Sequence, residues 1–236
     1  ISLPLQRWDF SYWAEKLKQK MYAFDEEQLR PYFPLERVRQ GIFDLYGRLY
    51  GLSFKENSKI DVYHPDVKVY EVYDGKRFMG VLYLDMHPRA SKRSGAWMTE
   101  FRGQSNMGGR EVRPLIQVVC NFSKPVGNEP ALLSFDEVET FMHEFGHAMH
   151  GMLTDCTYPS VSGTNVKRDF VELPSQVMEN WCYESEFLNT FAKHYQTGDT
   201  VPGEYIRKIK AAEKYLAGWY CVRQLSLGLV DFAFHS

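Results

Sequence analysis

Apolar residues recur along the chain at two different periods, and the change of period predicts which segments are helices and which are strands. Residues 8–21 carry apolar side chains at helical spacing after Asp9, a suitable N-cap, so they predict a helix with one buried face. A second apolar stripe over residues 35–50 ends before Gly51, which suits a helix stop. Two helices are therefore expected before the pattern changes.

In the middle of the chain the apolar period shortens to two, which is typical of strands. Residues 68–86 indicate two short β-strands about a turn at residues 74–75, and residues 113–122 indicate a third. The intervening residues 92–111 are rich in glycine and polar side chains, so they predict a loop-like segment with little order of its own. A small, mainly antiparallel sheet is expected here.

Helical spacing returns after Ser134. This serine stands three residues ahead of Glu137, the spacing of a capping box, and the helix that it begins runs to about Leu153. Residues 154–167 contain proline, glycine and serines and predict a loop that reverses the chain. The helix after Ser134 is therefore expected to pack beside whatever follows the loop.

Two further helical segments complete the pattern. One carries Glu172 and begins within residues 169–173, because Pro174 is tolerated only in a first turn. The other is a long helical pattern over residues 205–234. No internal repeat or low-complexity linker divides the sequence, so we expect one region of the α+β class, predominantly helical, with its small sheet beside the helix after Ser134.

Composition and charge limit the classes of binding partner that we expect. Of the 236 residues, 44% are apolar and 15% aromatic, which is enough for a buried core. A formal net charge of −2 gives no broad attraction to nucleic acid or anionic membranes, and no apolar run is long enough for a membrane span. Ile1 is not a start methionine and the sequence ends in an unfinished helical pattern, so we expect an excised piece of a longer protein. We expect that protein to be cytoplasmic, although without the native N-terminus a targeting segment is not tested.

The four cysteines do not form a recognisable metal or disulfide motif. They are widely scattered, without the pairwise spacing of a zinc finger or the density of a disulfide scaffold: Cys120, Cys156, Cys182 and Cys221. We expect reduced, mostly buried thiols. Cys156 lies nearest the residues discussed next and is expected to pack rather than to bind a metal.

The main chemical motif is His143-Glu144-x-x-His147, on the helix that begins after Ser134. Residues four apart lie on one face of a helix, so the two imidazoles can converge on one zinc ion while Glu144 stands beside it. The alternative is a pair of histidines that pack or face solvent on an ordinary helix. The capped amphipathic helix behind a predicted strand favours the zinc site, as a zincin requires.

A catalytic zinc ion needs a third protein ligand and an open position. The metzincin pattern is excluded, because His150 and Leu153 occupy the positions of its glycine and its third histidine. His150 is expected to pack or to donate a hydrogen bond. Glu172, on a helix after the reversing loop, is the best third ligand, and the alternative is a carboxylate stabilised at a helix N-terminus.

The stretches HEFGHAMHGML and SGTNVKRDFVELPSQVMENW closely resemble the metallopeptidase family of thimet oligopeptidase, oligopeptidase A and peptidyl-dipeptidase Dcp. Similar stretches cover nearly the whole chain. The resemblance implies one Zn²⁺ per chain, a zincin-like fold and zinc-dependent hydrolysis of peptide bonds in short peptides. It implies these roles: His143, His147 and Glu172 as zinc ligands, and Glu144 as the catalytic residue that assists attack of zinc-bound water.

Histidine ligands need hydrogen-bond partners that orient the ring. By helical spacing Glu139, one turn before His143, and Glu179, two turns after Glu172, are candidates, each with the alternative of a solvated surface carboxylate. The strand near residues 118–122 either pairs with an extended peptide substrate or is an internal strand.

The chain also departs from the family. The long N-terminal helical half and the C-terminal loop that binds the reacting carbonyl are absent, and His235 matches no part of that loop. We therefore expect residues 1–236 to be a partial catalytic domain of a larger metallopeptidase that holds zinc but is weakly active or inactive alone. The alternative function is an inactive metal- or peptide-binding relative, against which the retention of Glu144 argues. Endopeptidase or dipeptidyl cleavage, side-chain preference and oligomeric state are left open.

Overall fold

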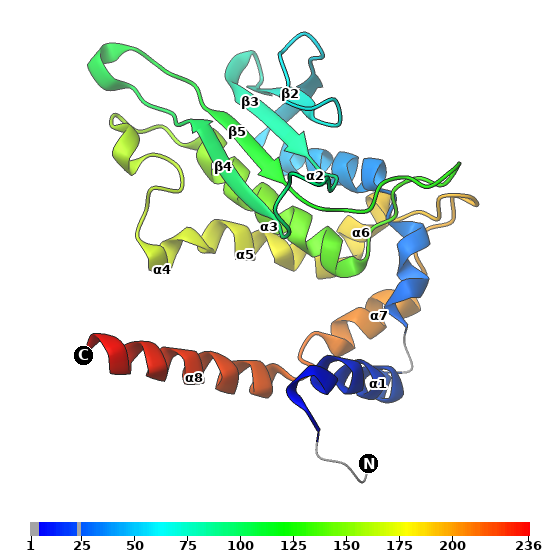
Figure 1. Cartoon of the computed structure of the whole chain (residues 1–236). Helices are drawn as coiled ribbons and strands as arrows, with labels where there is room; N and C mark the ends of the chain where they lie inside the picture. Colours follow the sequence, from blue (N-terminus) through cyan, green and yellow to red (C-terminus); the bar gives the residue numbers. More distant parts are fainter. Residues whose placement is uncertain (1–4, 23–24) are drawn as a thin grey trace. The chain divides into compact units, whose positions relative to one another are not determined.

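The computed structural model describes residues 5–22 and 25–236, which fall into two compact units (Figure 1). The larger unit comprises residues 26–201, and the smaller comprises the N-terminal residues up to 25 together with residues 202–236. Among the helices of the described residues, none has the length and apolar character needed to cross a membrane.

The larger unit is built on one five-stranded sheet in the order β1-β2-β3-β5-β4. Its strands are β1 (Leu52–Glu56), β2 (Lys68–Asp74), β3 (Arg77–Asp85), β4 (Trp97–Arg102) and β5 (Leu115–Val119). Only β3 and β5 pair in parallel, and the other neighbours are antiparallel. The mainly antiparallel sheet is confirmed, with the turn between β2 and β3 at residues 75–76, where Gly75 has a φ of 55°.

The expectation of a loop-like segment over residues 92–111 is wrong, because β4 lies within it and forms one edge of the sheet. Most side chains of β4 stay at least partly exposed, so its sequence carries little apolar alternation. Backbone pairing with β5 makes it a strand, as in the pair Trp97 and Val119. β5 ends at Val119 and is flanked by β3 and β4, so residues 118 and 119 belong to an internal strand with both edges paired, and a peptide cannot add to β5.

Helices cover this sheet in layers. The α-helices are α2 (Leu35–Tyr50), α3 (Phe135–Leu153), α4 (Arg168–Val171), α5 (Leu173–Glu179) and α6 (Ser185–Phe191). Short 3-10 turns are η2 (Glu26–Tyr32), η3 (Met107–Gly109), η4 (Pro159–Val161) and η5 (Asn180–Tyr183). In Figure 1, α3 runs along one face of the sheet, and α5 packs on the side of α3 that faces away from the strands. This is the predicted α+β class.

The core of the larger unit lies where α2, α3 and β1 meet. Phe43 stacks on Phe54 with ring centroids 4.2 Å apart, and the ring of Phe145 lies 5.0 Å from that of Tyr46. The predicted stop of α2 is also present, because Gly51 adopts the left-handed conformation, with a φ of 73°. The apolar stripe of α2 is thus buried as its spacing predicted.

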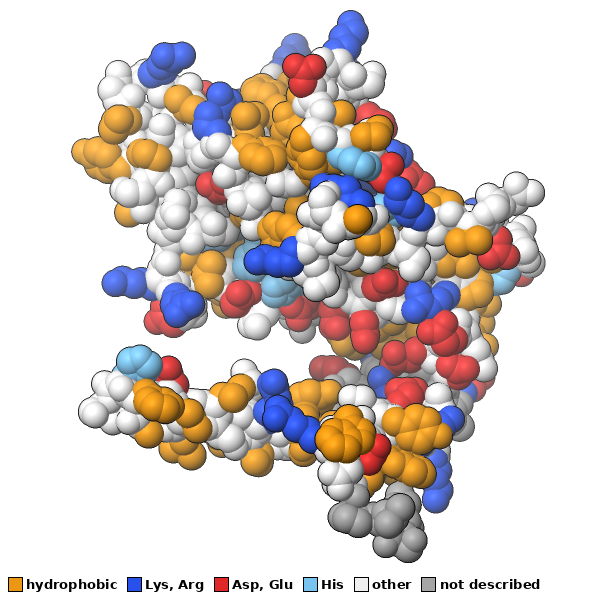
Figure 2. Space-filling model, viewed as in Figure 1, with side chains coloured by type: hydrophobic (Ala, Val, Ile, Leu, Met, Phe, Trp, Pro, Cys, Tyr) orange, Lys and Arg blue, Asp and Glu red, His pale blue; other side chains and the backbone are white. Residues whose placement is uncertain are grey.

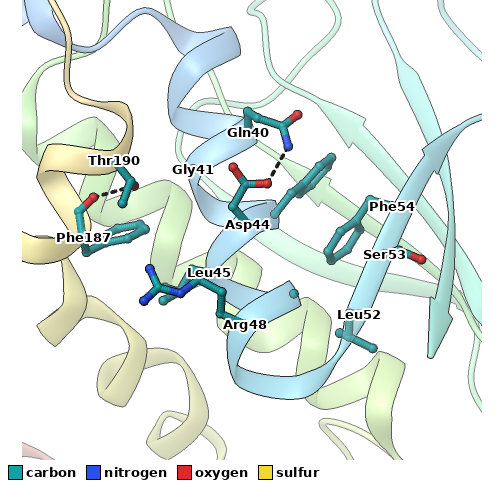
Figure 3. Close-up of a pocket in the computed structure, with 12 residues that line it drawn as sticks. Gln40, Gly41, Asp44, Leu45, Arg48, Leu52, Ser53, Phe54, Phe187 and Thr190 are labelled. Atoms are coloured by element: carbon teal, nitrogen blue, oxygen red, sulfur yellow. Dashed lines mark hydrogen bonds between the residues drawn. The ribbon is translucent and has the colours of Figure 1, made fainter. Parts of the chain in front are cut away.

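A hollow of about 610 Å³ lies between α2, β1 and α6 (Figure 3). Its charged lining residues are Asp44, which accepts a hydrogen bond from Gln40, and Arg48. Gly41 allows α6 to approach α2 here, because a Cβ at this position would lie 2.5 Å from the ring of Phe191. We interpret this hollow as a feature of helix packing.

The smaller unit contains η1 (Arg7–Asp9), α1 (Phe10–Tyr22), α7 (Gly203–Ala212) and α8 (Ala217–His235). The predicted helix near residues 8–21 is present, but the expected buried face is wrong, since none of the described residues of α1 is buried. A stripe of apolar residues buries only where a neighbour covers it. Asp9 accepts a hydrogen bond from the Gln6 amide and so closes η1, instead of capping α1.

Few side chains join the helices of this unit. Phe10 stacks on Trp219 with ring centroids 4.2 Å apart, and the Tyr215 hydroxyl donates to the Ala14 carbonyl at 2.5 Å. The single helical pattern predicted over residues 205–234 is interrupted between α7 and α8, where Leu216 has a φ of 55°. The pattern did not show this break because apolar residues continue through it.

Candidate metal centre

Helix α3 begins at a capping box, as the sequence predicts. The Glu137 amide donates to Ser134 Oγ at 3.1 Å, and the Ser134 amide donates to the Glu137 carboxylate at 2.8 Å. These bonds satisfy two of the amides that a helix start leaves unpaired. The fixed start and the 19-residue length hold His143 and His147 on successive turns of one face.

The structure brings His143, His147 and Glu172 together. Glu172 Oε2 lies 3.3 Å from His143 Nε2 and 3.0 Å from His147 Nε2. The two rings are nearly perpendicular, with centroids 4.8 Å apart, and one ligand atom of each of the three residues lies within 4.8 Å of the others. Figure 2 shows histidine side chains gathered on the viewer's face of the larger unit, with acidic side chains near them.

Glu172 reaches the histidines because α5 packs very closely on α3. A Cβ at Gly146 would lie 2.7 Å from Ser175 Cα and 2.9 Å from the Pro174 carbonyl oxygen, so only glycine permits this approach. Glu172 itself lies between α4 and α5, with φ −86° and ψ −8°, and not inside one helix as expected. Pro174 is in the first turn of α5, as predicted.

The two acidic residues proposed as partners of the histidines have different positions. Glu179 Oε1 lies 2.5 Å from His143 Nδ1, and since a carboxylate can only accept, that nitrogen donates and Nε2 keeps its lone pair. This hydrogen bond raises the pKa of His143. Glu139 accepts its hydrogen bond from the Tyr183 hydroxyl at 2.8 Å instead, and burial raises the pKa of Glu139.

Burial lowers the pKa of His147, whereas the hydrogen bond to Glu179 raises that of His143. A neutral imidazole is the form that binds a metal. Among the residues that the structure describes, His147 Nδ1 is buried without a hydrogen-bond partner. On its Nδ1 side this ring is therefore held by packing alone, in contrast to that of His143, whose Nδ1 has Glu179 as its partner.

Glu144 directly follows His143 on α3 and lines a pocket together with it. It is one of six residues that line a pocket of about 300 Å³: Ala96, Glu139, Thr140, His143, Glu144 and Glu179. Glu144 is only 8% exposed, and burial raises its pKa, while the charge of His143 and a backbone hydrogen bond from Met98 of β4 lower it in part. A carboxylate with a raised pKa facing a pocket suits proton transfer.

His150 and Cys156 stay outside this cluster. The His150 ring lies 6.2 Å from that of Phe170, and Cys156 Sγ donates to the Val161 carbonyl at 3.5 Å. All four cysteines are free, with Cys120 and Cys182 buried. Cys156 thus packs in the reversing loop, as expected.

The donor set fits zinc. Two imidazole nitrogens and one carboxylate oxygen are ligands that catalytic zinc sites use, and ligands at about 2.1 Å in tetrahedral geometry lie about 3.4 Å apart. The separations of 3.3 and 3.0 Å between Glu172 Oε2 and the two imidazole nitrogens are close to that value. The three residues could therefore hold the ion with small movements.

Comparison with known proteins agrees with this geometry. The family model described as peptidase family M3 matches residues 2–236. The chain belongs to peptidase family M3. The family explains why the sequence resemblance extends well beyond the histidine motif.

Several curated relatives share this M3 region. Oligopeptidase A of Escherichia coli (strain K12) is 46% identical over 235 residues, covering 98% of this chain and 35% of that protein. Dipeptidyl carboxypeptidase of the same strain is 40% identical over 232 residues, covering 98% and 34%. The probable cytosolic oligopeptidase A of Arabidopsis thaliana is 42% identical over 240 residues, covering 98% and 34%. The chain spans about a third of the length of these relatives.

Sequence reasoning missed two contributors to the site of this M3 chain. One is the backbone of β4, which reaches Glu144 through Met98 and carries no side-chain signal. The other is Ser175, fully buried, whose hydroxyl lies 3.0 Å from Glu172 Oε2. Its spacing of three residues from Glu172 is the only sign in the sequence, and many serines share such a spacing with a glutamate.

Proposed function

We propose that this family M3 chain is the metal-binding core of a zinc peptidase that hydrolyses peptide bonds in short peptides. The observation that supports it best is the meeting of His143, His147 and Glu172 next to a pocket that Glu144 lines. Relatives named oligopeptidase A and dipeptidyl carboxypeptidase support the same reaction. Because the chain covers about a third of these relatives, the activity of a longer protein that contains it is part of the proposal.

In this proposal His143, His147 and Glu172 hold the ion, and Glu179 orients the His143 ring. A zinc ion held by these residues would acidify a water molecule and polarise the carbonyl of the scissile peptide bond. A carboxylate oxygen of Glu144 accepts the proton of the attacking water and later delivers it to the leaving amine.

The free edge of β4 is the proposed binding place for an extended peptide. Since β5 occupies the other edge, the outer backbone groups of β4 are available for pairing by strand addition. Met98 connects this strand to Glu144, so a paired peptide would lie beside the proton-transfer group. The names of the relatives include both oligopeptidases and dipeptidyl carboxypeptidases, and both cleavage modes remain within the proposal.

The alternative, an inactive relative that only binds a metal or peptide, is less well supported. Glu144 is buried beside the histidines and yet is not one of the three clustered ligand residues. Burying a carboxylate destabilises the fold, and a site that only binds a metal through the three ligands does not need this buried carboxylate. Its position is explained by a role in proton transfer.

Zinc content and hydrolysis of an internally quenched peptide test the proposal. His147→Ala and Glu172→Ala are expected to abolish stoichiometric zinc binding. Glu144→Gln, made in the longer protein that contains this chain, is expected to keep the zinc and to lower hydrolysis about 10²–10⁴-fold, as loss of a general base does. Zinc retained in His147→Ala, or unchanged hydrolysis in Glu144→Gln, would contradict the proposal. Products from a peptide with a blocked C-terminus then distinguish internal from dipeptidyl cleavage.

We also propose a cytoplasmic location. One Arabidopsis relative is named a probable cytosolic enzyme, while another is named chloroplastic/mitochondrial. Four free cysteines, two of them buried, fit a reducing compartment. Imaging of the tagged protein in its own cells tests the location, and a signal confined to an organelle would contradict it.

A further inference from the structure

Ser175 is the only described residue besides the two histidines for which a short polar contact to the Glu172 carboxylate is seen. Its hydroxyl lies 3.0 Å from Glu172 Oε2 and 2.9 Å from the Glu172 carbonyl oxygen. That carbonyl already accepts from the Gln176 amide at 2.9 Å. The single hydroxyl hydrogen thus has two acceptors within reach, and the ionised carboxylate is the one that accepts the stronger, charge-assisted hydrogen bond.

Besides Ser175, the two candidate-ligand histidines make the short polar contacts of the Glu172 carboxylate with the described residues. The Glu172 side chain is 50% exposed and lies at the junction of α4 and α5. A long, exposed glutamate samples several rotamers, and binding a metal through it requires one of them. A fixed donor close to Oε2 selects the conformation in which this oxygen faces the histidines.

Ser175 is itself held by helix α3. It is fully buried, and its Cα lies so close to Gly146 that a Cβ there would approach to 2.7 Å. Gly146 directly precedes His147. The helix that carries both histidines therefore also fixes the residue that restrains the third candidate ligand.

We infer that Ser175 is a positioning residue for the metal centre, which holds the Glu172 carboxylate toward His143 and His147. This inference rests on the proposed function, because it requires that these three residues bind the metal. Ser175 does not touch the metal or the substrate and acts only through Glu172. Its contribution is to metal affinity and coordination geometry.

Zinc affinity, measured by competition with a chromophoric chelator, tests this inference on the whole chain. Ser175→Ala removes the hydroxyl but keeps the Cα and amide that contact Gly146. We expect zinc binding to weaken about 10–100-fold, as for other residues that orient metal ligands. Cobalt(II) provides a spectroscopic measurement, and its visible absorption bands should change in Ser175→Ala because the carboxylate ligand is less well fixed.

Ser162→Ala is the matched control. Ser162 is also fully buried, but its hydroxyl donates to Gln104 Oε1 at 3.4 Å and not to a candidate ligand. Loss of a buried hydroxyl should lower thermal stability in both variants, whereas zinc affinity and the cobalt spectrum should change only in Ser175→Ala. Equal effects of the two variants on zinc affinity would overturn the inference.

A double variant tests whether Ser175 acts through Glu172. The Glu172→Ala variant no longer holds one zinc per chain, but its residual zinc affinity can be measured by the same competition at higher metal concentration. In this background the hydroxyl has no carboxylate to hold, so adding Ser175→Ala should cause no further loss of that residual affinity. Additive losses would overturn the inference and show a general effect on packing. If the unchanged chain binds zinc and Ser175→Ala binds it equally well, this inference alone fails. If the unchanged chain binds no zinc, the proposed function fails with it.

Discussion

Helices α3 and α8 are both 19 residues long, yet their surroundings are opposite. Eleven residues of α3 are buried, whereas none of the residues of α8, all of them described, is buried. The α8 sequence is nevertheless the more apolar of the two, and apolar side chains line much of it in Figure 2. Apolar content alone therefore does not bury a helix; a neighbour with a matching surface is required.

The helix starts differ in the same way. A reciprocal capping box fixes the start of α3, while α8 follows Leu216, which has a left-handed backbone and makes no side-chain cap. A defined start keeps residues in register with their neighbours over several turns. Both histidines of the candidate metal centre lie on the helix that has both a cap and a neighbour.

The largest expected contrast between the helices comes from removing one aromatic ring. Phe145→Ala, in the core beside α3, should lower the free energy of unfolding by about 3–5 kcal/mol, since it leaves a cavity. Phe232→Ala in α8, where the ring is 72% exposed, should change it by less than about 0.5 kcal/mol. Urea unfolding followed by circular dichroism measures both, and equal losses would show that α8 is buried in solution.

Replacing one glycine in each helix should change the free energy of unfolding less, and in opposite directions for α3 and α8. Gly146→Ala places a Cβ 2.7 Å from the backbone of α5 and should destabilise by about 1–3 kcal/mol, with loss of zinc binding. Gly228→Ala meets open space and should stabilise α8 by up to about 1 kcal/mol through helix propensity. Thermal unfolding and zinc titration of both variants measure these effects. A Gly146→Ala variant with normal zinc affinity would contradict the close packing.

Substitutions at the starts of the two helices should change the free energy of unfolding less than these glycine substitutions. Ser134→Ala removes the cap of α3 and should cost about 1 kcal/mol. Leu216→Gly relieves a left-handed leucine and should stabilise the start of α8 by at most about 1 kcal/mol. Helix content at 222 nm during urea unfolding measures both changes. Destabilisation by Leu216→Gly would show that its side chain has a partner in solution.

The smallest expected effect is a pH dependence of the free energy of unfolding, caused by a carboxyl group that packs against α3. Glu100 of β4 packs so near Gly151 that a Cβ there would lie 2.6 Å from its carboxylate, and burial raises the pKa of Glu100. The folded state then binds more protons than the unfolded state, so stability falls as pH rises from the usual carboxyl range through the raised pKa. Glu100→Gln should flatten this fall. Unfolding measured between pH 4 and 8 checks the slope, and an unchanged slope would contradict the assignment.

Local signals made much of the larger unit predictable from the sequence. The serine-glutamate cap, the stop at Gly51 and the histidine motif depend on residues close in sequence, and each lies where it was expected. Glu172 could be proposed from its place after a reversing loop, and family resemblance supported it. Its actual position depends on the contact between Gly146 and Ser175, which spacing along the chain does not show.

The errors also have a physical cause. Strand β4 was missed because pairing with β5 makes it a strand, while its own side chains stay partly exposed. The buried face expected for α1 failed because an apolar stripe predicts burial only when a neighbour is present. Both outcomes depend on segments distant in sequence, and so they could not be derived from local patterns.

The strand order β3-β5-β4 also sets the order in which this M3 region can form during synthesis. Strand β4 leaves the ribosome before β5, but β5 is its only strand neighbour in the described sheet, so β4 has nothing to pair with at first. Domains fold as their chain emerges, and a strand that waits for a later one delays completion. Both histidines and Glu172 follow β5 in sequence. A growing chain therefore has both strands of this edge before it has any of the residues proposed to bind zinc.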